Sequence, residues 1–296
     1  MKKETVGTIG GLPVVRGVRD LRLRIDAWRD AGESVALAPT MGALHPGHLA
    51  LVTRGKALAD RVVASIFVNP AQFAPNEDFA RYPRDEAGDA AKLLATGCDL
   101  LYAPPVEEIY PEGFSTTVSA GAIAEGLCGR FRPGHFAGVA TVVTKLLQQS
   151  EVDVALFGEK DYQQLQVVRR VVRDLDIPVH IEGVPTVRDQ DGLALSSRNA
   201  YLSRVDRAIA PTIYRVLSEA ARRVKSGVEI AAALGDAHAE LKRSGFARID
   251  YLEAVDAESL APLARAARPG RPGRILVALW LGETRLIDNV ALAPLG

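Results

Sequence analysis

The stretch that decides the fold reads SVALAPTMGALHPGH and occupies residues 34–48. It begins with a short apolar run, continues through a turn that contains Gly42, and ends where a helical pattern begins at Gly47. The length and apolar content of residues 34–38 favour a buried strand. A strand, a glycine-containing turn and a helix start form the unit at which open parallel sheets bind ligands. The stretch therefore predicts both an architecture and a place for a site.

The first two thirds of the chain repeat this alternation. Apolar runs predict further strands at residues 62–68, 100–103, 152–157 and 179–184, and helical spacing predicts helices at residues 47–59, 85–95, 138–149 and 162–175. Strands that alternate with helices indicate βαβ units, which bring the strands into a parallel sheet. The predicted fold class is α/β, with a Rossmann-like parallel sheet flanked by helices.

A second pattern follows after about residue 186. It consists of two long Ala/Arg-rich helices at residues 205–226 and 229–244, which end at Gly227 and Gly245, and of strands at residues 249–255, 275–281 and 285–288, with a loop at residues 268–274. Residues 187–192 read as a linker. We expect a Rossmann-like domain at residues 1–186 and a smaller α+β domain at residues 187–296.

Composition excludes several classes of protein. The 296 residues suggest about two domains, and the formal net charge is zero, so the chain has no bulk attraction to nucleic acid or to an anionic membrane. The longest apolar run, residues 275–281, is far shorter than the about 18 residues of a membrane span, and no signal peptide is evident. Two cysteines are too few for a zinc cage or a disulfide framework. We expect a cytoplasmic protein that acts on a small molecule and binds neither nucleic acid nor membrane.

Two histidines stand at the predicted helix start. His45 and His48 are three positions apart, which places them on one side if the turn is already helical. The unpaired N–H groups of a helix N-terminus favour anions, and two imidazoles beside them suit a phosphate group. A metal pair and a purely structural pair are the alternatives, and spacing alone leaves all three open.

The motif HPGH at residues 45–48 resembles the His-x-Gly-His signature of the nucleotidylyltransferase superfamily. The longer string PTMGALH at residues 39–45 resembles the pantoate–β-alanine ligase family within it. Three further blocks resemble that family: SIFVNPAQF at residues 65–73, RFRPGHFAGV at residues 130–139 and FGEKDYQQL at residues 157–165. The family usually has methionine at the position of Ala71, a change that we expect to affect packing only.

The resemblance implies a role for each matching residue. ATP contacts are implied for Met41, Gly42, Ala43, Leu44, His45, Pro46, Gly47, His48, Gly158, Glu159, Lys160, Asp161, Val187, Leu195, Ser196, Ser197 and Arg198. Pantoate or β-alanine contacts are implied for Asn69, Gln72, Arg132, His135 and Gln164. By the same match His48 is the proton donor, His45 its partner on the phosphates, and Lys160 and Arg198 stabilise phosphate charge. Asp89 matches an acidic position that helps hold Mg²⁺ in the family, and a solvated helix carboxylate is the alternative. We expect residues 1–186 to bind nucleotide and pantoate and residues 187–296 to close over the ATP site.

The loop DGLALSSRN at residues 191–199 corresponds to the superfamily's Lys-Met-Ser-Lys-Ser loop but lacks both lysines, so the resemblance gives Arg198 the cationic role. The implied reaction joins (R)-pantoate to β-alanine with ATP through pantoyl adenylate, and family members are usually homodimers. A nucleotidyltransferase that stops after nucleotide transfer is the alternative enzyme. A regulatory nucleotide-binding module is the alternative outside enzymes, and the length disfavours a tRNA synthetase.

Overall fold

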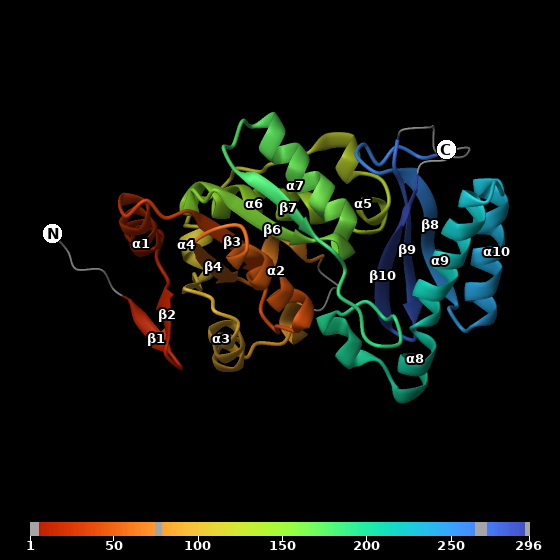
Figure 1. Cartoon of the computed structure of the whole chain (residues 1–296), viewed down its shortest axis with the longest axis horizontal. Coiled ribbons are helices and arrows are strands. Elements are labelled where there is room, and N and C mark those ends of the chain that lie inside the picture. The colour runs from red at the N-terminus through yellow and green to blue at the C-terminus, as the bar shows by residue number, and fades with distance from the viewer. Residues whose placement is uncertain (1–5, 75–78, 264–270, 294–296) are drawn as a thin grey trace. The chain divides into compact units, whose positions relative to one another are not determined.

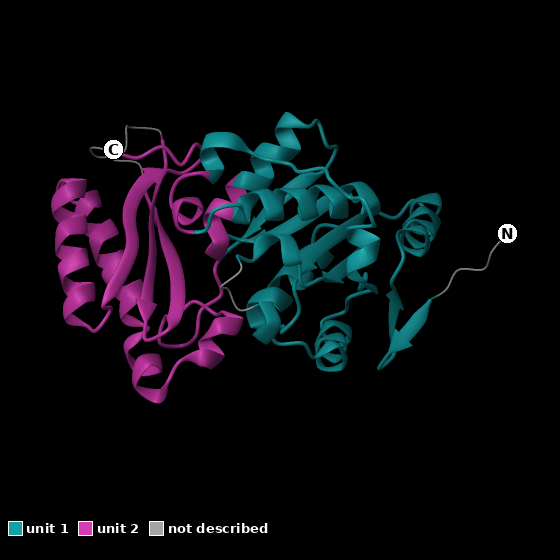
Figure 2. Cartoon of the chain, turned by 180° about the vertical axis from the view of Figure 1, so that it is seen from behind, with its two compact units in different colours: residues 1–124, 132–159, 167–185 teal, residues 125–131, 160–166, 186–296 magenta. Residues whose placement is uncertain are grey.

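The computed structural model of the chain describes residues 6–74, 79–263 and 271–293. These residues divide into two compact units, coloured separately in Figure 2. Unit 1 contains the described residues of Met1–Ala124, Arg132–Glu159 and Val167–Pro185, and unit 2 contains those of Glu125–Phe131, Lys160–Gln166 and Thr186–Gly296. The expected first domain included the two short segments Glu125–Phe131 and Lys160–Gln166, whereas both pack within unit 2.

Unit 1 is built on a seven-stranded sheet (Figure 1). Its strands are β1 (Gly7–Ile9), β2 (Leu12–Val15), β3 (Val35–Thr40), β4 (Arg61–Ile66), β5 (Leu100–Tyr102), β6 (Val154–Gly158) and β7 (His180–Val184). Their order is β1-β2-β5-β4-β3-β6-β7, and all neighbours are parallel except the β1–β2 hairpin. This strand order confirms the predicted Rossmann-like parallel sheet. The apolar runs could predict it because strands that are covered on both faces are apolar throughout.

Helices cover both faces of this sheet. They are α1 (Val18–Asp30), α2 (Pro46–Lys56), α3 (Glu86–Ala95), α4 (Val106–Ile109), α6 (His135–Ser150) and the C-terminal part of α7 (Tyr162–Asp174). Leu51 and Val52 of α2 pack with Ala36 and Val62 in one apolar cluster. Side chains alternate along a strand, so Leu37 points to the opposite face, where α1 and α6 pack.

Unit 2 contains an antiparallel sheet in the order β10-β9-β8, formed by β8 (Arg248–Asp256), β9 (Gly273–Leu281) and β10 (Thr284–Leu292). Its helices are α5 (Cys128–Phe131), the first turn of α7, α8 (Arg204–Ile209), α9 (Thr212–Lys225) and α10 (Ile230–Arg243). Alternate residues of β9, Ile275, Val277 and Leu279, pack against Val216 of α9 and Ala233 of α10. Among the described residues, no helix has the length and apolar character needed to cross a membrane.

The structure corrects two sequence expectations in unit 2. The helix expected at residues 205–226 is divided into α8 and α9, because Pro211 has no N–H and cannot continue the hydrogen-bond ladder. Residues 187–192 are part of an ordered hairpin, in which Arg188 pairs with Ala194 across a turn closed by Gly192. Part of the expected loop at residues 268–274 lies outside the described residues.

Candidate active site

The strand order of unit 1 reverses next to β3. From β3 the chain passes to β4 and then to β5 on one side, whereas β6 and β7 lie on the other side. Ligands of open α/β sheets bind beyond the carboxyl ends of the strands at such a reversal. The loop after β3 begins with Met41 and reaches His45, and the loop after β6 begins with Glu159. Two of the motifs found in the sequence therefore follow the two neighbouring strands at the reversal point.

A buried carboxylate holds the loop after β3. The side chain of Asp89, on α3, is 1% exposed, and its Oδ1 accepts the backbone N–H of Leu44 at 2.8 Å. Lys92 donates to the same oxygen at 3.3 Å and to the carbonyl of Leu44 at 3.0 Å. Gly42 has a φ of +83°, and a Cβ there would lie 3.2 Å from Asp89 Oδ2 and from Ile66. The loop therefore needs glycine at this position and is fixed to α3 by Asp89.

The two histidines cap helix α2. The Nδ1 atom of His45 accepts the N–H of Gly47 at 3.1 Å, and Nδ1 of His48 accepts the N–H of His45 at 3.3 Å. Pro46 occupies the first helical position, where its missing N–H costs nothing. A backbone N–H can only donate, so each neutral ring carries its proton on Nε2. Both histidines can therefore donate from Nε2 beside a helix N-terminus, the end that favours phosphate.

Gln72 lies at the centre of a polar cluster in unit 1. Its backbone carbonyl oxygen lies 2.9 Å from Nδ1 of His135, and Nε2 of His135 lies 2.9 Å from Nη1 of Arg132. The carbonyl only accepts and the guanidinium only donates, so this His135 is neutral with its proton on Nδ1. The side-chain Oε1 of Gln72 accepts from Nδ2 of Asn69 at 3.1 Å. The structure thus brings together four of the five residues predicted to contact pantoate or β-alanine.

Unit 2 contains the predicted lysine. The side chain of Lys160 is 19% exposed and lies 3.8 Å from the carboxylate of Asp161. Its backbone carbonyl accepts from Nδ2 of Asn289 at 2.9 Å, which ties the segment to β10. Gln164, the fifth residue predicted to contact pantoate or β-alanine, lies half-buried on the first turn of α7. No role was assigned to Asn289 from the sequence.

A buried ion pair anchors the loop with the serine–arginine motif. Arg188 donates to both carboxylate oxygens of Asp288 at 2.7 and 2.9 Å, and the two side chains are 16% and 3% exposed. Ser196 caps a 3-10 turn, η5 (Ser197–Tyr201), by accepting the N–H of Arg198 at 3.3 Å. The sequence assigned no role to Arg188 or Asp288, although Arg188 directly follows Val187, which it did select.

Each predicted site residue belongs to one of the two units. Unit 1 holds Met41, Gly42, Ala43, Leu44, His45, Pro46, Gly47, His48, Asn69, Gln72, Asp89, Arg132, His135, Gly158 and Glu159. Unit 2 holds Lys160, Asp161, Gln164, Val187, Leu195, Ser196, Ser197 and Arg198. Within the described part of the chain, no group of three or more His, Cys, Asp or Glu side chains is placed to hold a metal ion.

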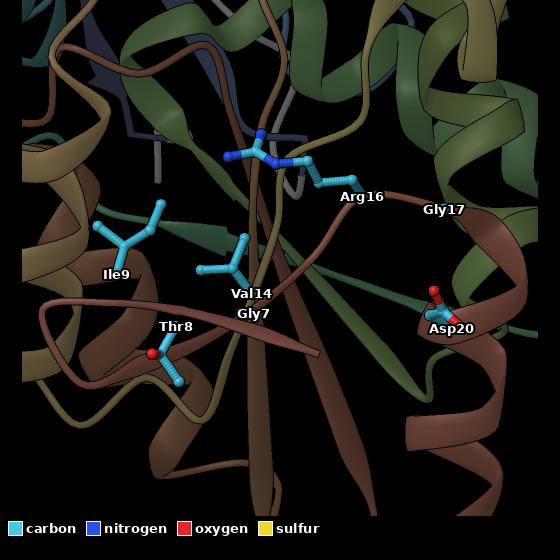
Figure 3. A pocket seen from close by; sticks show the side chains of 7 residues that line it. All are labelled: Gly7, Thr8, Ile9, Val14, Arg16, Gly17 and Asp20. Atoms are coloured by element: carbon cyan, nitrogen blue, oxygen red, sulfur yellow. The ribbon is translucent and has the colours of Figure 1, made fainter. Parts of the chain in front are cut away.

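A separate cavity of about 310 Å³ lies beside the β1–β2 hairpin (Figure 3). Its lining residues are Gly7, Thr8, Ile9, Val14, Arg16, Gly17 and Asp20. The guanidinium of Arg16 is already paired with Glu86, since both of its terminal nitrogens donate to that carboxylate at 3.0 Å. The residues predicted from the sequence do not line this cavity, so we place the candidate site at the strand ends instead.

Known proteins resemble this chain over nearly its whole length. Residues 13–291 match the family model described as pantoate-β-alanine ligase. A pantothenate synthetase of Paramagnetospirillum magneticum is 62% identical over 281 residues, which cover 95% of this chain and 98% of the relative. That of Caulobacter vibrioides is 56% identical over 278 residues, which cover 94% of this chain and 98% of the relative.

Solved structures show the same likeness. The crystal structure of pantothenate synthetase from Thermus thermophilus has a TM-score of 0.88 and 49% identity and covers 95% of this chain and 99% of its own. A pantoate-β-alanine ligase from Francisella tularensis, solved with β-γ ATP and β-alanine, has a TM-score of 0.78 and 33% identity, with 94% and 96% covered. The chain described here therefore belongs to the pantoate-β-alanine ligase family.

Proposed function

We propose that the chain performs its family's reaction, the ATP-dependent joining of (R)-pantoate to β-alanine, in two steps through pantoyl adenylate. In the first step a carboxylate oxygen of pantoate attacks the α-phosphorus of ATP, and the bond to the β-phosphate breaks with release of pyrophosphate. In the second step the amine of β-alanine attacks the acyl carbon. The C–N bond forms, AMP leaves with the carboxylate oxygen, and the amine loses a proton.

The observation that carries this proposal is the arrangement of His45 and His48 at the reversal of strand order. Both rings hold their Nε2 proton beside the N-terminus of α2. Groups that donate to a developing phosphate charge lower the barrier when they are already in position. Adenylyl transfer needs positioning and charge neutralisation more than a protein nucleophile. We assign His48 as proton donor to the leaving phosphate and His45 as its partner.

The remaining ATP contacts follow the family match. We propose that Lys160 and Arg198, with Ser196 and Ser197, stabilise charge on the transferring phosphates. Their chemistry suits this task, because an ammonium neutralises phosphate as a point charge and a guanidinium can donate two parallel hydrogen bonds. The other ATP contacts are assigned to residues 41–48, Gly158, Glu159, Asp161, Val187 and Leu195. Residues 187–296 are proposed to close over bound ATP, and solution scattering with and without ATP tests that closure.

We propose that pantoate and β-alanine are bound by Gln72, Gln164, Arg132 and His135. The amides of the two glutamines donate to pantoate oxygens, and the guanidinium of Arg132 attracts a carboxylate.

We propose that Mg²⁺ enters with ATP, because this ion usually keeps phosphate and water ligands and needs only one or two carboxylates. Asp89 already accepts from Leu44 and from Lys92 and is buried, which fits an anchor for the loop better than a metal ligand. When bound, Mg²⁺ would neutralise phosphate charge. A homodimer and a cytoplasmic location are further proposals, which sedimentation equilibrium and cell fractionation would test.

The function is tested by following both products with pantoate labelled with ¹⁸O in its carboxylate. With ATP, Mg²⁺ and pantoate, we expect about one pyrophosphate per site, and steady release of AMP only after β-alanine is added. One ¹⁸O atom should appear in AMP. Release of ADP and phosphate would contradict the adenylate, and steady turnover that β-alanine does not change would support the nucleotidyltransferase alternative.

A further inference from the structure

Asn69 lies just after β4 and is 1% exposed. Its Oδ1 accepts the N–H of Ala71 at 3.2 Å and the hydroxyl of Tyr110 at 2.7 Å. Its Nδ2 donates to the carbonyl of Gly138 and to Oε1 of Gln72, both at 3.1 Å. A side-chain amide has two donor hydrogens and two acceptor lone pairs. Protein groups therefore use the full hydrogen-bonding capacity of Asn69, which favours an indirect role over contact with a substrate.

The polarity of these contacts fixes how the amides are oriented. The N–H of Ala71 can only donate and the carbonyl of Gly138 can only accept, so the oxygen and nitrogen of Asn69 are assigned without ambiguity. The second hydrogen on Nδ2 then requires an acceptor, which is Oε1 of Gln72. The amide nitrogen of Gln72 consequently faces the other way, where it lies 3.0 Å from Sδ of Met41.

This orientation determines what Gln72 offers to a ligand. Met41 opens the loop that carries His45 and His48, so the NH₂ group of Gln72 lies beside that loop. A thioether sulfur is a weak acceptor, and a hydroxyl or carboxylate oxygen would accept the same hydrogen more strongly. A reversed Gln72 amide would present its oxygen instead, which repels a carboxylate oxygen and cannot donate to a hydroxyl oxygen.

Tyr110 is held in place for this contact. Its ring centroid lies 6.1 Å from that of Phe67 and 5.1 Å from that of Phe114. Burial raises the pKa of Tyr110 to about 12, so the hydroxyl keeps its proton and donates at neutral pH. Helix α6 also lies close, because a Cβ on Gly138 would come within 2.2 Å of the carbonyl oxygen of Ala71. Close packing thus fixes both the donor and the acceptor that orient Asn69.

We propose that Tyr110 is a positioning residue for pantoate: through Asn69 it fixes the amide of Gln72 so that Nε2 donates to the substrate. The inference rests on the proposed function, in which Gln72 contacts pantoate. Asn69 is then the link between Tyr110 and Gln72 and not itself a pantoate ligand.

The test compares Tyr110→Phe with Tyr102→Phe in the full-length chain. Each substitution removes one tyrosine hydroxyl that donates to a side-chain amide, since Tyr102 donates to Oε1 of Gln149 at 3.1 Å. Loss of one such hydrogen bond corresponds to about a fivefold change in a dissociation constant. We expect Tyr110→Phe to raise the KM for pantoate about fivefold with the KM for ATP unchanged. Tyr102→Phe should leave the KM for pantoate unchanged, and an equal rise in both variants would overturn the proposal.

A double-mutant cycle with Gln72→Ala shows whether Tyr110 acts through Gln72. In the Gln72→Ala background we expect Tyr110→Phe to have no further effect on the KM for pantoate. The same rise in both backgrounds would overturn the inference. It would also be overturned if the KM for pantoate stayed parental in Tyr110→Phe but rose in Gln72→Ala. In that last case the proposed pantoate contact stands. A parental KM in Gln72→Ala would overturn that contact and this inference together.

Discussion

The backbone N–H of His45 donates to Nδ1 of His48 at 3.3 Å, and the two imidazole rings lie 4.0 Å apart. The side chain of His45 in turn accepts the backbone N–H of His48, which completes a reciprocal capping box at the start of α2. Capping boxes usually pair Ser or Thr with Glu or Gln three residues later. Here two histidines have that spacing, so one pair of side chains both caps the helix and presents two Nε2 donors.

The double role of His48 predicts that stability and activity can be separated. His48→Ala removes a catalytic donor and a cap, so we expect kcat to fall about 100- to 1000-fold and the free energy of unfolding to fall by about 1 kcal/mol. In His48→Gln the amide oxygen can still accept the N–H of His45. That variant should keep parental stability in urea unfolding but remain slow in pyrophosphate release. A parental rate in His48→Ala would remove His48 from the mechanism.

Asp89→Asn tests whether this carboxylate anchors the loop or binds the metal. An asparagine oxygen can still accept the N–H of Leu44, but it no longer carries charge opposite Lys92. We expect a severalfold higher KM for ATP, of the order of one weakened hydrogen bond to a charged group, about 1 kcal/mol. The dependence of the rate on Mg²⁺ concentration should not change. A shift of that dependence to higher Mg²⁺ would restore Asp89 as a metal ligand.

The pair Arg188–Asp288 should stabilise unit 2 far more than the exposed pair that Asp191, in the same hairpin as Arg188, forms with Arg207 of α8. Removing one partner of a buried ion pair leaves an uncompensated charge, so Asp288→Asn should lower the free energy of unfolding by about 3 kcal/mol. The carboxylate of Asp191, which is 43% exposed and pairs with Arg207, provides the control. Asp191→Asn should cost less than about 1 kcal/mol. Urea unfolding measures both, and equal losses would contradict the buried anchor.

The buried thiol of Cys98 should make the folded chain less stable at alkaline pH. Both cysteines are free and buried, and burial raises the pKa of the Cys98 thiol to about 11. An unfolded thiol ionises near about pH 8.5, whereas the folded one keeps its proton to higher pH. Ionisation then favours the unfolded chain, so stability is lost as the pH rises from about 8.5 towards 11, by about 2 to 3 kcal/mol. Unfolding of Cys98→Ala should show a smaller loss over this range, and identical pH profiles would contradict the prediction.

The local sequence pattern was sufficient to predict the central strands of unit 1. The strands β3, β4, β5, β6 and β7 lie where the apolar runs predicted them, because a strand covered on both faces leaves a continuous apolar signal. The first 30 residues were not interpreted, although residues 6–30 contain β1, β2 and α1. The signal was present there: Gly10 and Gly11 both have positive φ, and a Gly-Gly pair between short apolar runs is typical of a hairpin.

The sequence by itself determined the α/β class and the family and proposed the residues of the candidate site, because these depend on short motifs and their periodicity. Only the tertiary structure decided which of those residues are half-buried donors and which are buried anchors. Asn69 meets its Tyr110 donor 41 positions away, and Arg188 meets Asp288 100 positions away. Burial and hydrogen-bond capacity are properties of such distant contacts, so no local pattern of residues specifies them.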